Sequence, residues 1–152
     1  MENYLFKNVS FSYPEVEEKA LADISFSVNQ GEFLILCGPS GCGKSTLLRH
    51  LKTCLTPHGR HEGEILYGGV PLDTVDDRTQ AQQIGFVMQS PENQVVTDKV
   101  WHELAFGLES LGYDTPTIRR RVAEVAAFFG IENWFYKNVT ELSGGQKQLL
   151  SL

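Results

Sequence analysis

The chain has 152 residues, of which 41% are hydrophobic and 21% charged, values typical of a soluble globular protein and too apolar for intrinsic disorder. This length fits one domain. The net charge of −6 disfavours a general nucleic-acid binder, so we expect no nucleic acid as a partner. The longest obvious apolar run, residues 33–37, is far shorter than the roughly 20 residues of a membrane span, and we expect the chain neither to cross a membrane nor to be exported.

Alternation of apolar and polar residues predicts two half-buried antiparallel strands in the N-terminal part. The apolar members of these two alternations are Val9, Phe11 and Tyr13, and then Ile24, Phe26 and Val28. Residues 33–37 are apolar on both faces, as expected of a strand buried inside a parallel sheet. Further short strands are predicted at residues 64–67 and 84–88, and Cys37 is expected to be a buried thiol.

Three helices are predicted after the strand at residues 33–37. The first covers residues 45–52, which contain good helix formers. The second has Thr97 or Asp98 as its N-cap and ends at Gly112. The third has Thr115 as its capping residue and Pro116 as its first helical residue, and it ends at Gly130. Three consecutive arginines, residues 119–121, lie mostly off the apolar stripe of that helix, and a solvated face explains them better than an anion site.

A glycine-rich loop follows the strand at residues 33–37 and matches the phosphate-loop pattern G-x-x-x-x-G-K-[ST] in full. It consists of Gly38, Pro39, Ser40, Gly41, Cys42, Gly43, Lys44, Ser45 and Thr46. Glycines allow the backbone N–H groups to form an anion cradle, to which the following helix adds its positive N-terminal end. Lys44 supplies a charge for the β- and γ-phosphates and Ser45 a hydroxyl for Mg²⁺. The pattern predicts a nucleoside triphosphate together with Mg²⁺, and by itself it does not choose among kinases, GTPases, helicases and transport ATPases.

A second motif selects among the classes of protein that carry such a loop. Near the C-terminus stands LSGGQKQ, in which the expected binding residues are Ser143, Gly144, Gly145 and Gln146. Two glycines after a serine suit a helix N-terminus that approaches a phosphate with its backbone amides. Together with the phosphate loop, this motif resembles the signature of ABC transporter nucleotide-binding domains. The resemblance implies a head-to-tail pair of ATPase subunits, identical or related, in which the signature of one caps the γ-phosphate held by the other.

Other positions extend this resemblance over essentially the whole chain. Tyr13 matches the aromatic residue that stacks on adenine, although a strand residue packed on its own sheet is the alternative. Gln89 matches the catalytic and Mg²⁺-contacting glutamine of the Q-loop, and an amide can both ligate a cation and donate a hydrogen bond. Residues 90–96 and 101–107 resemble the ATPases of energy-coupling factor (ECF) transporters, which import vitamins and metal ions. Membrane subunits as partners and a peripheral place on the cytoplasmic face of the membrane follow from that resemblance.

The implied fold is an α/β P-loop NTPase with a mostly parallel sheet, an N-terminal antiparallel β subdomain and a helical subdomain. Residues 1–88 would form the β subdomain and phosphate-loop core, residues 89–143 the Q-loop and helical subdomain, and residues 144–152 the start of the signature helix. In the family, the Walker B acidic pair and the catalytic histidine follow the signature. Neither has a credible substitute in these 152 residues, and His50, His58, His61 and His102 are expected on helix surfaces or in a loop.

Three functions remain open on these residues. The leading one is the ATP-binding component of an ABC importer of ECF type that couples ATP hydrolysis to transport. The second is a soluble ABC ATPase of repair or translation, and the third is a non-catalytic nucleotide-binding fragment. Because the acidic pair is lacking, the 152-residue chain alone is expected to bind nucleotide weakly or not at all and not to turn over ATP. Parallel strands that the family places beside the phosphate-loop strand are also lacking, so we expect uncovered apolar surface.

Overall fold

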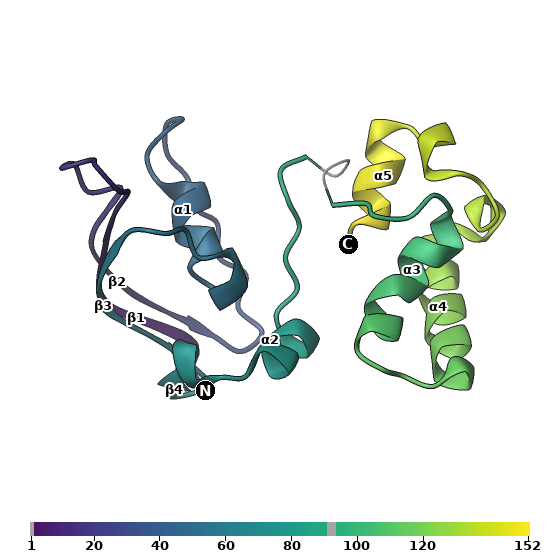
Figure 1. The fold of residues 1–152 in the computed structure, drawn as a ribbon, viewed down its shortest axis with the longest axis horizontal. Coiled ribbons are helices and arrows are strands. Elements are labelled where there is room, and N and C mark those ends of the chain that lie inside the picture. Colours follow the sequence, from purple (N-terminus) through teal and green to yellow (C-terminus); the bar gives the residue numbers. More distant parts are fainter. Residues whose placement is uncertain (1, 91–93) are drawn as a thin grey trace. The chain divides into compact units, whose positions relative to one another are not determined.

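The computed structural model describes residues 2–90 and 94–152. Two compact units make up the chain, Met1–Ile84 and Gly85–Leu152, called the first and the second unit below. Figure 1 shows the strands and the phosphate loop with its helix in the first unit, and the larger helices in the second. Residues 91–93, which belong to the segment that carries part of the ECF resemblance, lie outside the described residues.

The first unit is built on a four-stranded antiparallel sheet in the order β2-β1-β3-β4. Its strands are β1 (Glu2–Ser12), β2 (Leu21–Asn29), β3 (Arg60–Tyr67) and β4 (Val70–Pro71). Gly68 and Gly69, with φ of 57° and 86°, form the two-residue turn between the last two strands, because both positions need the left-handed backbone that glycine adopts freely. The predicted N-terminal antiparallel sheet is confirmed.

Two short helices pack with this sheet: α1 (Lys44–Arg49) and α2 (Asp77–Gln83). The core under α1 combines side chains from β1 and β2 with Leu47 of the helix, and further buried residues come from the segment that includes α2. Its buried members are Tyr4, Phe6, Val9, Phe11, Leu21, Leu47, Leu72 and Ile84. The Phe6 and Phe26 rings stack across neighbouring strands at 4.5 Å between centroids. The alternation at Val9 and Phe11 therefore correctly identified the buried face.

The two central strands that the sequence predicted are not formed among the described residues. Residues 33–37 and 84–88 belong to no strand or bridge, and Cys37 is exposed rather than buried. Phe33 is 87% and Ile35 67% exposed, which confirms the expected uncovered apolar surface. A strand that is apolar on both faces forms only where neighbouring strands pair with its backbone, and the described residues offer these segments no such partner.

The second unit contains α3 (Val100–Ser110), α4 (Thr115–Phe129) and α5 (Gly144–Leu150). α3 lies against α4 and also contacts α5, as Figure 1 shows. Gly112 (φ 76°) and Gly130 (φ 65°) follow the ends of α3 and α4, as predicted. A small core of Val100, Val139, Leu142 and Leu150 holds the unit together. The helical subdomain is thus confirmed, and none of the described helices has the length and apolar character to cross a membrane.

Two predicted helix starts are displaced by one or two residues. The N-cap of α3 is Lys99, not Thr97 or Asp98, and no side chain caps it. The Glu103 carboxylate, inside the helix, instead accepts the Thr97 N–H at 2.9 Å and the Thr97 hydroxyl at 2.8 Å. Thr97 therefore binds a helix side chain and does not cap the helix. α4 has Asp114 as its N-cap, and Thr115 is its first helical residue.

Buried Gln80 on α2 joins three segments of the first unit. Its amide oxygen accepts the Thr53 N–H and hydroxyl, each at 3.0 Å, and its amide nitrogen donates to the Val75 carbonyl at 2.7 Å and the Leu72 carbonyl at 3.3 Å. Only 2% of Gln80 is exposed, so losing the amide would leave these groups unpaired away from water.

We predict that Gln80→Ala lowers the free energy of unfolding by about 2–4 kcal/mol, because it combines a cavity with unpaired polar groups. Urea denaturation followed by circular dichroism measures this loss. Gln82→Ala, at an exposed position of the same helix, is the matched control and should change stability by less than about 0.5 kcal/mol. Equal stability of the two variants would contradict this role of Gln80.

Candidate nucleotide-binding site

The phosphate loop, residues 38–46, leads into α1 as the sequence predicted, although residues 33–37 directly before it form no strand. Gly41 and Gly43 have φ of 84° and 90°, a left-handed backbone that other residues adopt only with strain. The loop is also tightly placed: a Cβ at position 43 would lie 2.5 Å from the Ala20 carbonyl oxygen. Glycine at position 43 therefore lets the loop approach the start of β2.

Lys44 binds the backbone of its own loop in this structure. Its ammonium group donates to the Pro39 carbonyl at 2.7 Å and to the Gly38 carbonyl at 2.9 Å, with Cys42 Sγ at 3.5 Å. Through these bonds the backbone of the loop surrounds the Lys44 ammonium group, which places a full positive charge inside the loop. An anion that enters the loop would meet this charge together with the loop's backbone N–H groups.

Residues next to Lys44 divide between solvent and core. Ser45 is exposed, so its hydroxyl is accessible to a hard cation such as Mg²⁺. Thr46 and Leu47 are buried, and Leu47 anchors α1 in the core of the first unit. Among the described residues, no three His, Cys, Asp or Glu side chains come together to hold a metal ion.

Tyr13, which follows β1, is linked to the phosphate-loop helix. Its hydroxyl lies 3.0 Å from Thr46 Oγ1, and its ring packs edge-on against Phe11 at 4.8 Å between centroids. Tyr13 is 38% exposed and lines an open hollow of about 770 Å³ together with residues 14–17 and 58–60. The structure thus places the predicted adenine-stacking ring beside the predicted phosphate loop, with one side of the ring fixed by the protein.

His50 lies one turn beyond Thr46 and is buried, which corrects the expectation that it lies on the helix surface. Its Nδ1 is 2.7 Å from the Thr46 carbonyl oxygen, and its ring packs edge-on against Phe11. Burial is the main cause that lowers the pKa of His50, opposed by the bond to Thr46 and aided by nearby His61. His61 lies in β3 rather than in a loop. The spacing alone could have indicated that His50 is buried, because residue 50 shares a helix face with buried residues 46 and 47.

The remaining predicted site residues lie in the second unit. Gln89 is exposed at a bend after residues 84–88. Ser143 is the N-cap of α5, and Gln146 completes a capping box: Gln146 Oε1 accepts the Ser143 N–H at 2.8 Å and Ser143 Oγ accepts the Gln146 N–H at 3.3 Å. Gly144 and Gly145 have open space at their Cα positions.

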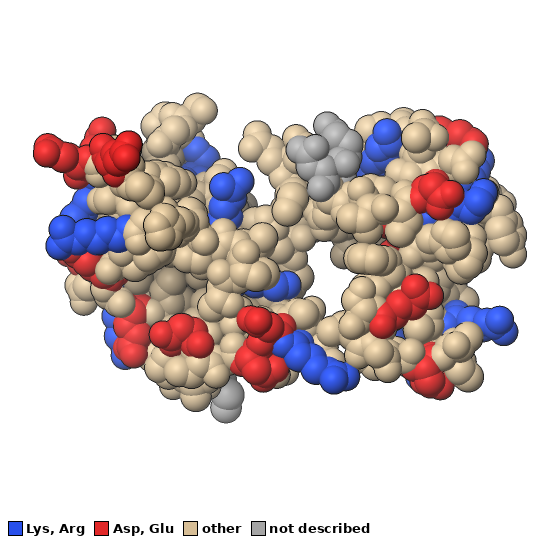
Figure 2. All heavy atoms as spheres, in the orientation of Figure 1, with Lys and Arg blue, Asp and Glu red and all other residues tan. Residues whose placement is uncertain are grey.

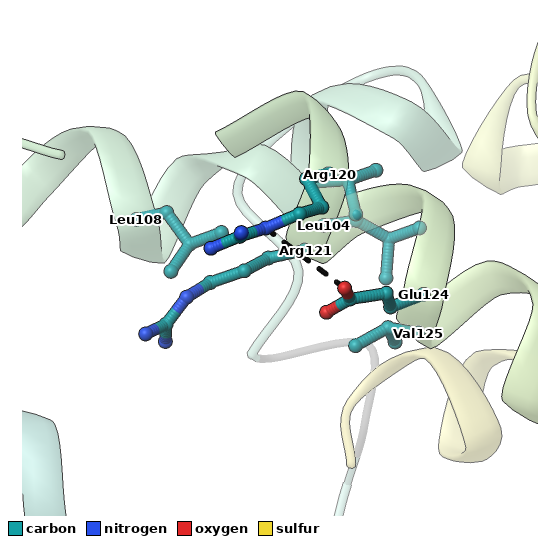
Figure 3. A pocket seen from close by; sticks show the side chains of 7 residues that line it. Leu104, Leu108, Arg120, Arg121, Glu124 and Val125 are labelled. Atoms are coloured by element: carbon teal, nitrogen blue, oxygen red, sulfur yellow. Dashed lines mark ion pairs between the residues drawn. The ribbon is translucent and has the colours of Figure 1, made fainter. Parts of the chain in front are cut away.

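The arginine run on α4 borders a hollow between α3 and α4 of about 470 Å³. Arg120 pairs with Glu124 at 3.9 Å, and Arg121 lies over the Tyr113 ring at 4.9 Å from its centroid. Figure 3 shows both arginines and Glu124 with Leu104 and Leu108 around this hollow. Acidic and basic side chains are interspersed over the visible face of each unit (Figure 2). The contacts of Arg120 and Arg121 are those that a solvated helix face would make.

Known proteins resemble this chain over nearly all of its length. The family described as "ABC transporter" matches residues 21–152. A Bacillus anthracis protein whose name describes an ABC transporter ATP-binding protein is 49% identical, with 96% of this chain and 26% of that protein aligned. The cobalt import ATP-binding protein CbiO of Syntrophus aciditrophicus is 36% identical, and the ECF transporter ATP-binding protein EcfA1 of Lacticaseibacillus paracasei 35%, each covering 96% of this chain and 51% of the relative.

A solved structure shares the fold as well. The CbiO1 protein of Clostridium perfringens, described as part of the ABC transporter complex CbiONQ, superposes with a TM-score of 0.84 at 28% identity, covering 99% of this chain and 59% of that one. This likeness confirms the predicted α/β P-loop class. The chain spans between about a quarter and about half of the length of the curated relatives it matches.

The close approach at Gly43 generates a prediction that separates it from Gly41. Both substitutions by alanine strain a left-handed backbone, by roughly 1–2 kcal/mol each. Gly43→Ala must also displace the Ala20 carbonyl, whereas a Cβ at position 41 meets nothing within 4 Å. We expect Gly43→Ala to lose at least about 1 kcal/mol more unfolding free energy than Gly41→Ala in urea denaturation. Equal losses would show that the loop is not pressed against β2.

Proposed function

Because the chain belongs to the ABC transporter family, we propose that it is part of the ATP-binding component of an importer, and that ATP binding and hydrolysis there drive solute uptake. The observation that carries the proposal is the complete phosphate loop wrapped around Lys44 and joined to Tyr13 through Thr46. The named relatives add support, since one acts in cobalt import and another in an ECF transporter. We propose the ECF type of importer, with a vitamin or a transition-metal ion as solute.

In this proposal the loop binds the triphosphate of ATP. Lys44 would exchange the Gly38 and Pro39 carbonyls for phosphate oxygens, because a charged oxygen is a stronger acceptor than a neutral carbonyl. Backbone N–H groups of residues 38–46 would complete the cradle. The Tyr13 ring would stack on adenine, and its bond to Thr46 would fix the distance between the base and phosphate subsites.

The Ser45 hydroxyl would contact Mg²⁺ together with phosphate oxygens and water, and a contact with Mg²⁺ is also what the family resemblance implies for Gln89. Both side chains are exposed and offer the hard, uncharged oxygens that suit this ion beside a polyphosphate. When bound, Mg²⁺ supplies charge neutralisation at the β- and γ-phosphates. Gln89 would also orient the attacking water, because its amide can accept from one neighbour and donate to another.

The signature residues would act on a second copy of the domain. The capping box orients Ser143 and Gln146 toward each other and begins α5 at two glycines whose Cα positions are open. In a head-to-tail pair of identical or related subunits, this helix start would face the γ-phosphate held by the partner. Closure of the pair would then act on transmembrane subunits, so we propose a peripheral location on the cytoplasmic face of the membrane.

Uptake measurements in cells test this proposal. Deletion of the gene should abolish ATP-dependent accumulation of one radiolabelled vitamin, cobalt or nickel. The wild-type gene should restore uptake. The Lys44→Ala gene should restore less than about a hundredth of the wild-type uptake rate, because the loop loses its only full charge for the phosphates. Arg49→Ala, an exposed cation at the end of α1, is the control and should restore uptake fully. Normal uptake after deletion, with the protein bound to ribosomes or DNA, would favour the soluble alternative instead.

A further inference from the structure

We propose that Gln94 is a positioning residue that ties the backbone leading to Gln89 to the end of α5. Gln89 and the first residues of α5 are the two parts of the second unit that the proposed function brings to nucleotide, and the inference rests on that function. Gln94 lies within residues 90–96, which carry part of the ECF resemblance. Its side chain bonds to three backbone groups of the second unit.

The Gln94 amide uses its oxygen and its nitrogen on different partners. Oε1 accepts the Met88 N–H at 2.8 Å, while Nε2 donates to the Phe86 carbonyl at 3.2 Å and to the Ser151 carbonyl at 3.4 Å. These partners also fix the orientation of the amide. Turned by half a rotation, its oxygen would face two carbonyls and its nitrogen would face an N–H group.

The Gln94 amide binds two backbone groups of the segment directly before Gln89. Phe86 and Met88 are alternate residues of an extended segment, so the carbonyl of one and the N–H of the other lie on the same edge of the backbone. Among the described residues, this segment belongs to no strand or bridge. The Gln94 amide supplies one acceptor and one donor at that edge, and thereby fixes the backbone directly before Gln89.

The chain on the other side of Gln94 is fixed as well. Val95 packs against the core of the second unit, which includes Leu142 and Leu150 on either side of the signature residues. Glu103 in the first turn of α3 accepts the N–H groups of Val96 at 3.2 Å and Thr97 at 2.9 Å. Because Gln94 is anchored to α3 through this segment, a shift of α5 would change its bond to Ser151 without moving Gln94 freely.

Gln94 therefore offers a short path between two proposed nucleotide contacts. α5 begins at Gly144, after the Ser143 cap, and its C-cap is Ser151, whose carbonyl accepts from Gln94. Gln94 holds Met88, and Met88 is the neighbour of Gln89 in the chain. A movement of α5 on ATP binding would therefore be transmitted to Gln89 through the Gln94 side chain.

Hydrogen exchange of the protein purified with its membrane partners tests the bridge, using Gln94→Ala and Gln94→Glu. In Gln94→Ala, the Met88 amide should exchange about tenfold faster, and amides of residues 148–151 should also exchange faster. Gln94→Glu keeps an acceptor for Met88 but loses both donated bonds, so Met88 should stay protected while residues 148–151 exchange faster. Gln82→Ala is the control, with no change at either place. Unchanged exchange in Gln94→Ala would overturn the inference.

Steady-state ATP hydrolysis by the same preparations separates positioning from simple structural support. Gln94→Ala should lower kcat about tenfold and leave KM for ATP within about twofold, because the phosphate loop belongs to the first unit. The melting temperature should stay within about 2 °C of the wild type. Faster exchange with an unchanged kcat would overturn the positioning role. Wild-type hydrolysis in Lys44→Ala would overturn the proposed function instead, whatever Gln94 does.

Discussion

The close approach of Gly43 to the Ala20 carbonyl is the constraint on which the candidate site depends. No other residue type leaves room for this contact and also adopts the left-handed backbone at that position without strain. The contact fixes the start of α1 against the first strands, so that Leu47 enters the core and Thr46 reaches the Tyr13 hydroxyl. Lys44, at the first helical position, is then directed back into the loop.

The second unit depends on a different kind of interaction, in which side chains bind the backbone of irregular segments. The carboxylate of Glu103 holds residues 96 and 97, the amide of Gln146 caps α5, and the amide of Gln94 holds residues 86 and 88. Each replaces bonds that a helix or strand would make for itself. Such bonds are few and local, so a single substitution can loosen one segment and leave the fold intact.

Local patterns in the sequence predicted much of this structure. Alternation around Phe11 identified the buried face of β1, the glycines at 112 and 130 marked two helix ends, and the two glycines after Ser143 indicated a helix start. These features depend on residues near each other in the chain. Residues 33–37 and 84–88 were expected to form strands and do not. A strand depends on pairing with residues elsewhere in the sequence, which a local pattern does not reveal.

The site was predictable to the same extent and for the same reason. A continuous motif revealed the loop around Lys44, and family resemblance pointed to Tyr13, Gln89 and the signature. The bond of Tyr13 to Thr46 spans 33 positions of the sequence, and that of Gln94 to Ser151 spans 57. No local pattern reports such contacts. His50 was misplaced because a polar residue on a short helix was expected to face solvent, whereas its ring fills space beside Phe11.

A structure of the protein purified with its membrane partners, with Mg²⁺ and a non-hydrolysable ATP analogue, tests the central claim most directly. The account predicts the triphosphate inside residues 38–46, with Lys44 released from the Gly38 and Pro39 carbonyls and bound to phosphate oxygens. It also predicts residues 143–146 of a second copy within hydrogen-bond distance of the γ-phosphate. Nucleotide bound elsewhere, or Lys44 still bound to its own loop at saturating analogue, would contradict the account.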